Sequence, residues 1–175
     1  MRISGNYGSH LGPLIKVMSL TDGPVLELGI GFFSTPYLHY QCLVSNRYLA
    51  SYDNDRGWVK KFASQRGGTI CNFKYESPNH HFFYVDDWAK ADIEKPWDVV
   101  LVDHSPGPRR AVEIKRLANF AKFIVVHDAD PSQRGEREYH YSSIYPLFKY
   151  KKFWNKHSNL SVVLSNFVEL EGLWT

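Results

Sequence analysis

The sequence predicts an α/β fold in which helices cover both faces of a mostly parallel sheet that ends in an antiparallel hairpin. Apolar runs of strand length alternate with helical patterns from residue 9 to residue 126, which is the order of a parallel sheet. Residues 25–35 form an apolar run that meets two glycines at alternate positions, a pattern typical of a buried strand that turns sharply into a helix. The last two strand-like runs, 150–154 and 160–164, are close enough to pair as a hairpin.

The expected strands are short runs rich in Val, Ile, Phe and Tyr. Residues 99–102 are wholly apolar, as a central strand that is buried on both faces should be. We expect the strands at 25–28, 48–52, 81–85, 97–102 and 123–126, followed by the hairpin strands 150–154 and 160–164. Residues 69–73 also fit a short additional strand.

Helical patterns fill most of the intervals around these strands. Pro13 limits the start of the first helix, and Asp55 can cap the third. Ser34 or Thr35 can cap the second helix, and Pro36 fits its first position. The fourth helix carries an apolar stripe that is expected to face the core, made of Val112, Ile114, Leu117 and Phe120. The expected helices are 9–20, 36–44, 56–64 and 108–120.

Two glycines and a later carboxylate define a candidate nucleoside site. Gly29 and Gly31 lack Cβ atoms, so the backbone can turn tightly there and approach a ligand closely. Asp53 ends the second expected strand about 20 residues after Gly31, where a carboxylate can accept hydrogen bonds from both ribose hydroxyls. Glu27 precedes the turn and would oppose a pyrophosphate, which disfavours a nicotinamide dinucleotide and favours a cationic ligand.

These motifs resemble those of the class I S-adenosylmethionine (SAM)-dependent methyltransferases, whose first motif has the form E/D-x-G-x-G. The resemblance extends from about residue 25 to residue 126, and the four motifs stand in the order of the family. The matching positions are Glu27, Gly29 and Gly31, then Asp53, then Asp86-Asp87-Trp88, then Asp103. The resemblance implies a three-layer αβα Rossmann-like fold with a seven-stranded sheet in the order 3-2-1-4-5-7-6 and a closing antiparallel hairpin.

The resemblance also implies roles for the cofactor residues. Glu27 would lie near the methionine ammonium of SAM, and Asp53 would hold the ribose. Asp86 or Asp87 would contact the adenine amino group. Trp88 would pack on the adenine face, or alternatively anchor a turn as a core aromatic residue. The full cofactor-binding set is expected to be Glu27, Gly29, Gly31, Ser34, Thr35, Asp53, Asn54, Asp86, Asp87, Trp88 and Asp103.

Two polar clusters at strand ends are candidates for the chemistry. Asp103-His104 follows the fourth expected strand and His127-Asp128 the fifth, so both clusters should lie at one rim of the sheet. A neutral imidazole titrates near pH 7 and can accept a proton from a hydroxyl. His104 or His127 is therefore the candidate general base, with Asp103 in the same catalytic set. Either histidine could instead satisfy buried carbonyl groups.

The leading function is methyl transfer by direct displacement to a hydroxyl or an amine of a small-molecule or sugar-like substrate. A magnesium-dependent enzyme is an alternative, because Asp103-His104 resembles the Asp-His pair of catechol O-methyltransferase-like enzymes. Those enzymes have an Asp-Asn pair after the fifth strand, whereas this chain has Asp128-Ala129. Since the amide ligand is missing, we predict no metal ligands.

Three segments bear on the substrate. Arg109 and Arg110 begin the fourth expected helix and favour an anionic group on the substrate, or else form a solvated pair. Residues 130–145 are polar and aromatic, and we expect them to cover or line the substrate pocket. Residues 139–141 would either contact the substrate or pack on the sheet. Residues 4–10 are rich in glycine and aromatic side chains and are expected to close the other side of the cofactor.

Composition and charge limit the number of domains, the localisation and the partners that we expect. The chain has 175 residues, of which 43% are hydrophobic, and a formal net charge of +3, which predicts one domain spanning residues 1–175. A non-catalytic adenosine-ligand-binding domain stays open, as does a homo-oligomer. No apolar run reaches membrane-spanning length and no signal peptide is evident, so we expect a soluble cytoplasmic protein without a membrane partner. A nucleic-acid methyltransferase is a further alternative, supported by a basic group that a solvated strand face explains equally well: Lys149, Lys151, Lys152 and Lys156.

Overall fold

The computed structural model describes residues 8–63, 75, 77–130, 134–157 and 159–174 of the chain. Its centre is a seven-stranded sheet with the order β3-β2-β1-β4-β5-β7-β6, as predicted. The strands are β1 (Val25–Leu28), β2 (Leu49–Asp53), β3 (His80–Tyr84), β4 (Trp97–Val102), β5 (Ala121–Val126), β6 (Tyr150–Trp154) and β7 (Ser161–Ser165). The helices are α1 (Leu11–Met18), α2 (Ser34–Val44), α3 (Arg56–Ala63), α4 (Arg110–Leu117) and α5 (Arg134–Arg137).

The sheet is parallel except at one end. β1 pairs with β2 on one side and with β4 on the other, and β3 and β5 extend the sheet in the same direction. β7 lies antiparallel between β5 and β6, which confirms the predicted hairpin. The chain moves outward in opposite directions from β1 and from β4, so the loops at their carboxyl ends separate. A crevice at that point is the usual ligand site of an open α/β sheet.

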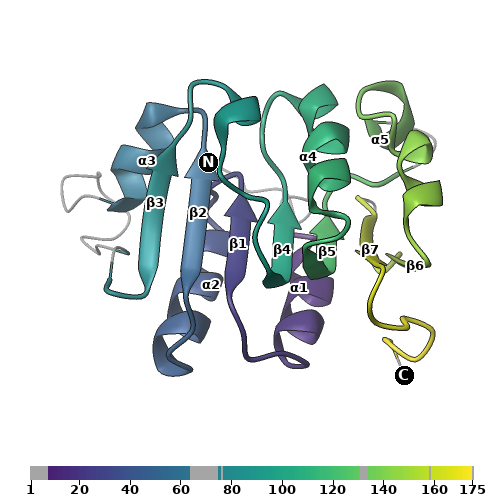
Figure 1. Cartoon of the computed structure of the whole chain (residues 1–175), viewed down its shortest axis with the longest axis horizontal. Coiled ribbons are helices and arrows are strands. Elements are labelled where there is room, and N and C mark those ends of the chain that lie inside the picture. The colour runs from purple at the N-terminus through teal and green to yellow at the C-terminus, as the bar shows by residue number, and fades with distance from the viewer. Residues whose placement is uncertain (1–7, 64–74, 76, 131–133, 158, 175) are drawn as a thin grey trace.

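The strands present apolar side chains to two packed layers because successive side chains point to opposite faces. Val25 and Leu49 pack with α1 and α2, whereas Leu26 and Val100 pack with α4. Helices α1, α2 and α3 cover one face of the sheet, and α4 together with residues 139–148 covers the other (Figure 1). This is the predicted three-layer arrangement.

The start of α2 differs from the prediction. The helix begins at Ser34 instead of residue 36, so neither Ser34 nor Thr35 is its capping residue and Pro36 is its third residue. The Thr35 hydroxyl instead donates a hydrogen bond to the buried carboxylate of Glu27 in β1. The predicted cap of α3 is confirmed, because Asp55 Oδ1 accepts a hydrogen bond from the Gly57 backbone N–H at 2.6 Å.

The predicted helix 108–120 is a short 3₁₀ turn, Gly107–Arg109, followed by the shorter helix α4. Its inward stripe was predicted wrongly in part, because Val112 is 42% exposed and Phe120 37% exposed. Two polar residues, Arg110 and Glu113, take inward positions beside Ile114 and Leu117. They do so because both have buried polar partners at the carboxyl end of β4. The first helix is also shorter than predicted, and the strand predicted at 69–73 lies outside the described residues.

In the described part of the chain, no helix has the length and apolar character needed to cross a membrane.

Candidate active site

The two glycines of the β1–α2 turn serve different needs. Gly29 has a φ of +100°, and a Cβ there would lie 2.6 Å from the backbone carbonyl of Asp103. Only glycine therefore fits where the end of β4 passes this turn. At Gly31 the nearest atom to an added Cβ is Ser34 Oγ at 3.7 Å. The packing of the protein does not require a glycine at this second position, so its small size leaves room for something outside the chain.

Glu27 anchors this turn from within the core. Its carboxylate is fully buried and accepts hydrogen bonds from Thr35 Oγ1 at 2.9 Å and from Ser51 Oγ at 2.6 Å. The Thr35 hydroxyl in turn accepts a hydrogen bond from the Gly31 backbone N–H at 2.9 Å. Burial raises the pKa of Glu27 to about 7, although its hydroxyl donors act in the opposite direction. Ser34 is also buried at this helix start.

Asp53 lies at the end of β2 and braces the same turn. Its Oδ2 accepts a hydrogen bond from the Ile30 backbone N–H at 2.9 Å, and its Oδ1 accepts one from the Asp55 backbone N–H at 2.8 Å. Burial raises the pKa of this carboxyl above its ordinary value. A carboxylate has about four acceptor positions, so the backbone of the turn does not use all of them.

A cleft of about 460 Å³ opens at the carboxyl ends of the strands. It collects six of the residues selected from the sequence: Gly29, Asp53, Asn54, Asp103, His104 and His127. Glu27, Ser34 and Thr35 are buried at the glycine turn and do not line it. Asp55, Trp58 and Asn159 line the cleft without having been assigned to the cofactor or the chemistry.

One end of the cleft is a polar corner formed by Asp103, Arg110, His127 and Asp128. Arg110 Nη2 lies 2.9 Å from Asp103 Oδ1, and His127 Nδ1 lies 3.1 Å from the same oxygen. Arg110 Nη1 lies 3.4 Å from Asp128 Oδ2. Strands β4 and β5 are neighbours, so their ends bring these groups together as predicted.

The charges of the polar corner shift two pKa values in opposite directions. Burial by itself would raise the pKa of Asp103, but His127 and Arg110 outweigh it and lower this pKa to about 2. Burial would likewise lower the pKa of His127, but Asp103 outweighs it and raises this pKa above 6.5. The pair therefore favours a carboxylate beside an imidazolium, and a neutral His127 readily takes up a proton.

His104 is in a different environment from His127. Its imidazole is buried against the Trp88 ring, with the two ring centroids 4.1 Å apart. His104 Nε2 lies 3.4 Å from Glu113 Oε2, and burial lowers the pKa of the imidazole. Of the two histidines predicted as the general base, His127 is the one that is paired with Asp103.

The guanidinium of Arg110 lies where the magnesium alternative would require a metal ion. Arg110 contacts both Asp103 and Asp128, the two carboxylates that would have to share the ion. Ala129 is buried and has no amide oxygen to offer. Arg109 is also paired, with Nη2 2.6 Å from Glu113 Oε1. Both arginines thus have carboxylate partners within the chain, and an anionic group on the substrate stays a prediction.

The third motif lies outside the cleft lining. Asp86 is exposed at the surface, and the Asp87 side chain accepts a hydrogen bond from the Ala89 backbone N–H at 2.9 Å, which caps a short 3₁₀ turn. Trp88 is 3% exposed and donates from Nε1 to the Ser105 carbonyl at 2.7 Å. Trp88 thus fits its alternative as a core aromatic residue. The adenine contacts of Asp86 and Asp87 stay predictions.

Residues 139–141 meet the cleft only through Tyr139. Its ring occupies the space above Gly107, where an added Cβ would collide with it, and the Arg110 guanidinium carbon lies 4.7 Å from the ring centroid. Tyr141 is buried and His140 is exposed. Tyr139 therefore holds Arg110 in place at the edge of the cleft.

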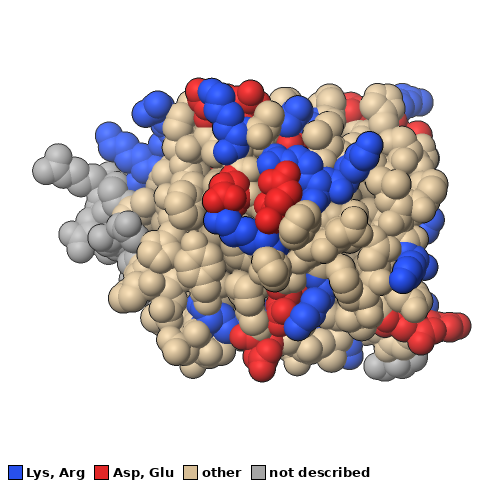
Figure 2. All heavy atoms as spheres, in the orientation of Figure 1, with Lys and Arg blue, Asp and Glu red and all other residues tan. Residues whose placement is uncertain are grey.

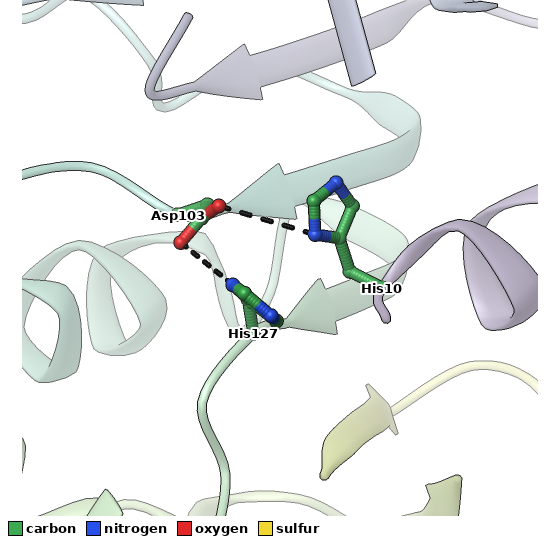
Figure 3. A group of neighbouring side chains, drawn as sticks. All are labelled: His10, Asp103 and His127. Carbon is green, nitrogen blue, oxygen red and sulfur yellow. Dashed lines mark hydrogen bonds and ion pairs between the residues drawn. The ribbon is translucent and has the colours of Figure 1, made fainter. Parts of the chain in front are cut away.

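Two residues just before α1 reach the polar corner, and the sequence did not assign them. Ser9 Oγ lies 2.9 Å from His127 Nε2, and His10 Nδ1 lies 3.9 Å from Asp103 Oδ2. Figure 3 shows the neighbouring imidazoles of His10 and His127, each directed at a different oxygen of the Asp103 carboxylate. The expected closing segment 4–10 includes both residues, but no local pattern indicated their partners.

No protein-family model matches the sequence, and no curated protein matches it. Solved structures do share its fold. The human methyltransferase-like protein 13 in complex with S-adenosylhomocysteine (SAH) has a TM-score of 0.63 and 12% identity, over 94% of this chain and 84% of that chain. The O-methyltransferase from Bacillus cereus in complex with SAH has a TM-score of 0.62 and 12% identity, over 94% and 82%.

A third structure agrees with these two. The O-methyltransferase TomG from Streptomyces achromogenes, which is involved in tomaymycin synthesis and was solved with SAM, has a TM-score of 0.61 and 15% identity, over 94% of this chain and 81% of that chain. At such identities the likeness establishes the fold. The chain therefore has the Rossmann-like fold of the SAM-dependent methyltransferases, as the sequence motifs predicted.

Proposed function

We propose that this protein is a SAM-dependent methyltransferase that acts on a hydroxyl or an amine of a small-molecule substrate. One observation carries the proposal: a single cleft is lined both by Gly29 of the glycine turn and Asp53 and by Asp103 and His127. Its volume of about 460 Å³ is typical of a pocket for a small organic ligand. Structural neighbours that hold SAH or SAM support the choice of cofactor.

The cofactor would lie across the β1–α2 turn. Gly31 leaves the space for a close approach, and Asp53 retains acceptor positions for the ribose hydroxyls. Glu27 would contribute by fixing the turn through Thr35, because its carboxylate is buried beneath the turn. This places the acceptor of the methyl group at the polar corner.

Methyl transfer requires that the acceptor atom be aligned with the sulfonium methyl and that one proton be removed from the acceptor. The lone pair of the acceptor attacks the sulfonium methyl, the sulfur–carbon bond breaks, and its electron pair stays on sulfur to give SAH. The acceptor proton passes to the Asp103–His127 pair. Both residues line the cleft, and Asp103 is the more accessible partner, with 25% of its side chain exposed against 5% for His127. In the neutral tautomer with the proton on Nε2, beside Ser9 Oγ, His127 can take up this proton on Nδ1, and its raised pKa favours that transfer.

A nucleic-acid substrate has weaker support. On the face of the molecule shown in Figure 2, Lys and Arg side chains are interspersed with Asp and Glu and with uncharged surface. Lys151 of the predicted basic group lies 4.6 Å above the ring centroid of Tyr145, so it also serves local packing. A continuous basic stripe is what phosphate binding would favour.

Calorimetric titration with SAM and with SAH tests the proposal. We expect saturable binding by the wild-type chain and a loss of more than about tenfold in affinity for Asp53→Ala, because the ribose loses its charged acceptor. The matched control is Asp22→Ala, an exposed position. Asp53→Ala also removes a brace of the turn, so melting curves must show that the variant is folded, and Asp53→Asn, which keeps one acceptor oxygen, should bind with intermediate affinity. Wild-type chain that binds neither compound would contradict the proposal.

A further inference from the structure

His10 is a buried imidazole that lacks a hydrogen-bond partner. It is 2% exposed, and neither ring nitrogen has a hydrogen-bond partner among the residues that the structure describes. The Asp103 carboxylate lies nearby, with Oδ2 3.9 Å from His10 Nδ1, which is too long for a hydrogen bond. An unsatisfied buried polar group costs about 1–3 kcal/mol. This cost is offset if another group binds between the imidazole and the carboxylate.

Three potential metal ligands converge at this point. His10, Asp103 and His127 each offer one ligand atom, and these atoms all lie within 4.8 Å of one another. The two imidazoles lie next to each other and contact the two oxygens of the same carboxylate (Figure 3). Ligands about 2.1 Å from a metal ion are about 3.0–3.4 Å apart, so the cluster would have to contract by ~1 Å to hold one. His127 Nδ1 and Asp103 Oδ1 are already 3.1 Å apart.

We propose that His10, Asp103 and His127 bind one divalent transition-metal ion of the Zn²⁺ type at the acceptor end of the cleft. Two imidazoles and one carboxylate suit a first-row transition metal better than Mg²⁺ or Ca²⁺, which take mostly oxygen ligands. The inference rests on the proposed function and deepens it. Because Asp103 and His127 also line the cleft, the ion would leave coordination positions open for the donor atom of the methyl acceptor. With the ion bound, His127 would be a ligand and would no longer act as the proton acceptor described above, so the acceptor would lose its proton to solvent.

Neighbouring groups already orient the three ligands. Ser9 Oγ lies 2.9 Å from His127 Nε2, so a proton on Nε2 leaves Nδ1 as the ligand nitrogen. Arg110 holds Asp103 Oδ1 at 2.9 Å, and Oδ2 is the oxygen that faces His10. Metal-binding histidines usually have such a partner on their second nitrogen. The positive charge of Arg110 weakens Asp103 as a ligand, which is a further reason to favour an ion that binds imidazole well.

The ligands also come from elements that pack directly on one another. His10 precedes α1, Asp103 follows β4, and His127 follows β5. Helix α1 packs against the sheet face through Leu14 and Val17, in the same core cluster as residues of β4 and β5. The side chains can therefore close on an ion without a rearrangement of the fold.

Metal titration of the chelator-treated full chain tests the inference. We expect calorimetry with Zn²⁺ to give one ion per chain, and Co²⁺ to give visible absorption bands of a site with nitrogen and oxygen ligands. His10→Gln and His127→Gln should each lower the affinity by more than about 100-fold, since loss of even an outer partner costs a metal site ~10- to 100-fold. The matched control His157→Gln, at an exposed turn, should bind like the wild type. Melting curves without metal establish that each variant is folded.

Three results would overturn the inference: no one-to-one binding by the wild type, equal affinity in folded His10→Gln, or displacement of Zn²⁺ by millimolar Mg²⁺. The Co²⁺ spectrum of the wild type does not depend on the folding of any variant. SAH titration of the same samples separates the two proposals. Binding of SAH without Zn²⁺ binding refutes the metal site alone, and binding of Zn²⁺ without SAH binding refutes the proposed function alone.

Discussion

At the residue scale, the two glycines of the β1–α2 turn separate a requirement of the fold from a requirement of the ligand. Gly29 has a positive φ and lies against the backbone of Asp103, so the fold itself excludes a side chain there. Gly31 has neither constraint. A substitution at each position therefore tests a different statement about the same turn.

We predict that Gly29→Ala lowers the free energy of unfolding by about 2 kcal/mol or more, because it adds a strained φ and a backbone collision. Gly31→Ala should change the free energy of unfolding by less than about 0.5 kcal/mol. It should nevertheless weaken SAH binding by about tenfold, since its methyl group enters the space left for the cofactor. Thermal unfolding and calorimetry measure the two effects. Equal stability of the two variants would show that the packing at Gly29 is misread, and unchanged SAH affinity in Gly31→Ala would remove the cofactor from this turn.

At the element scale, the rotation of α4 about its axis is set by the polar groups in its first turns. Arg110 bonds to the His104 carbonyl from Nε at 2.7 Å and pairs with Asp103, and Glu113 lies beside His104. These contacts set the rotation of the helix, so Ile114 is buried while Val112 is 42% exposed. The helix thus links the polar corner to the core beneath it.

This orientation predicts unequal effects of two truncations on the same helix. Ile114→Ala should lower the free energy of unfolding by about 2–4 kcal/mol, because it leaves a cavity in a close-packed core. Val112→Ala should lower it by less than about 1 kcal/mol, because the side chain is already partly in water. Urea denaturation with unchanged m-values measures both. Similar losses for the two variants would contradict the observed rotation of α4.

The same element shows what the sequence could predict. Strand positions were predicted to within two residues, because short apolar runs report burial directly and their alternation with helices indicates a parallel sheet. The inward face of α4 was not predicted correctly, since apolar periodicity does not reveal that Arg110 and Glu113 have buried partners. The sequence did predict that the glycine turn and Asp53 lie together, because their spacing is that of a nucleoside site. The position of His10 at the polar corner depends on where α1 packs, and no local pattern contains that information.

At the scale of the whole molecule, the fold places the glycine turn and the polar corner at one edge of the sheet. The outward divergence of the chain from β1 and β4 opens the crevice, and the cleft there runs from the glycine turn to the polar corner. Ser9 and His10, which precede α1, reach the same corner. A cofactor, an acceptor and the group that receives a proton can therefore meet in one place.

A crystal structure of the chain with SAH tests the central claim most directly. The account predicts density for the ribose beside Asp53, with the homocysteine chain over Gly31 and the sulfur directed toward Asp103 and His127. A cleft that stays empty at saturating SAH, or SAH bound elsewhere on the chain, would contradict it.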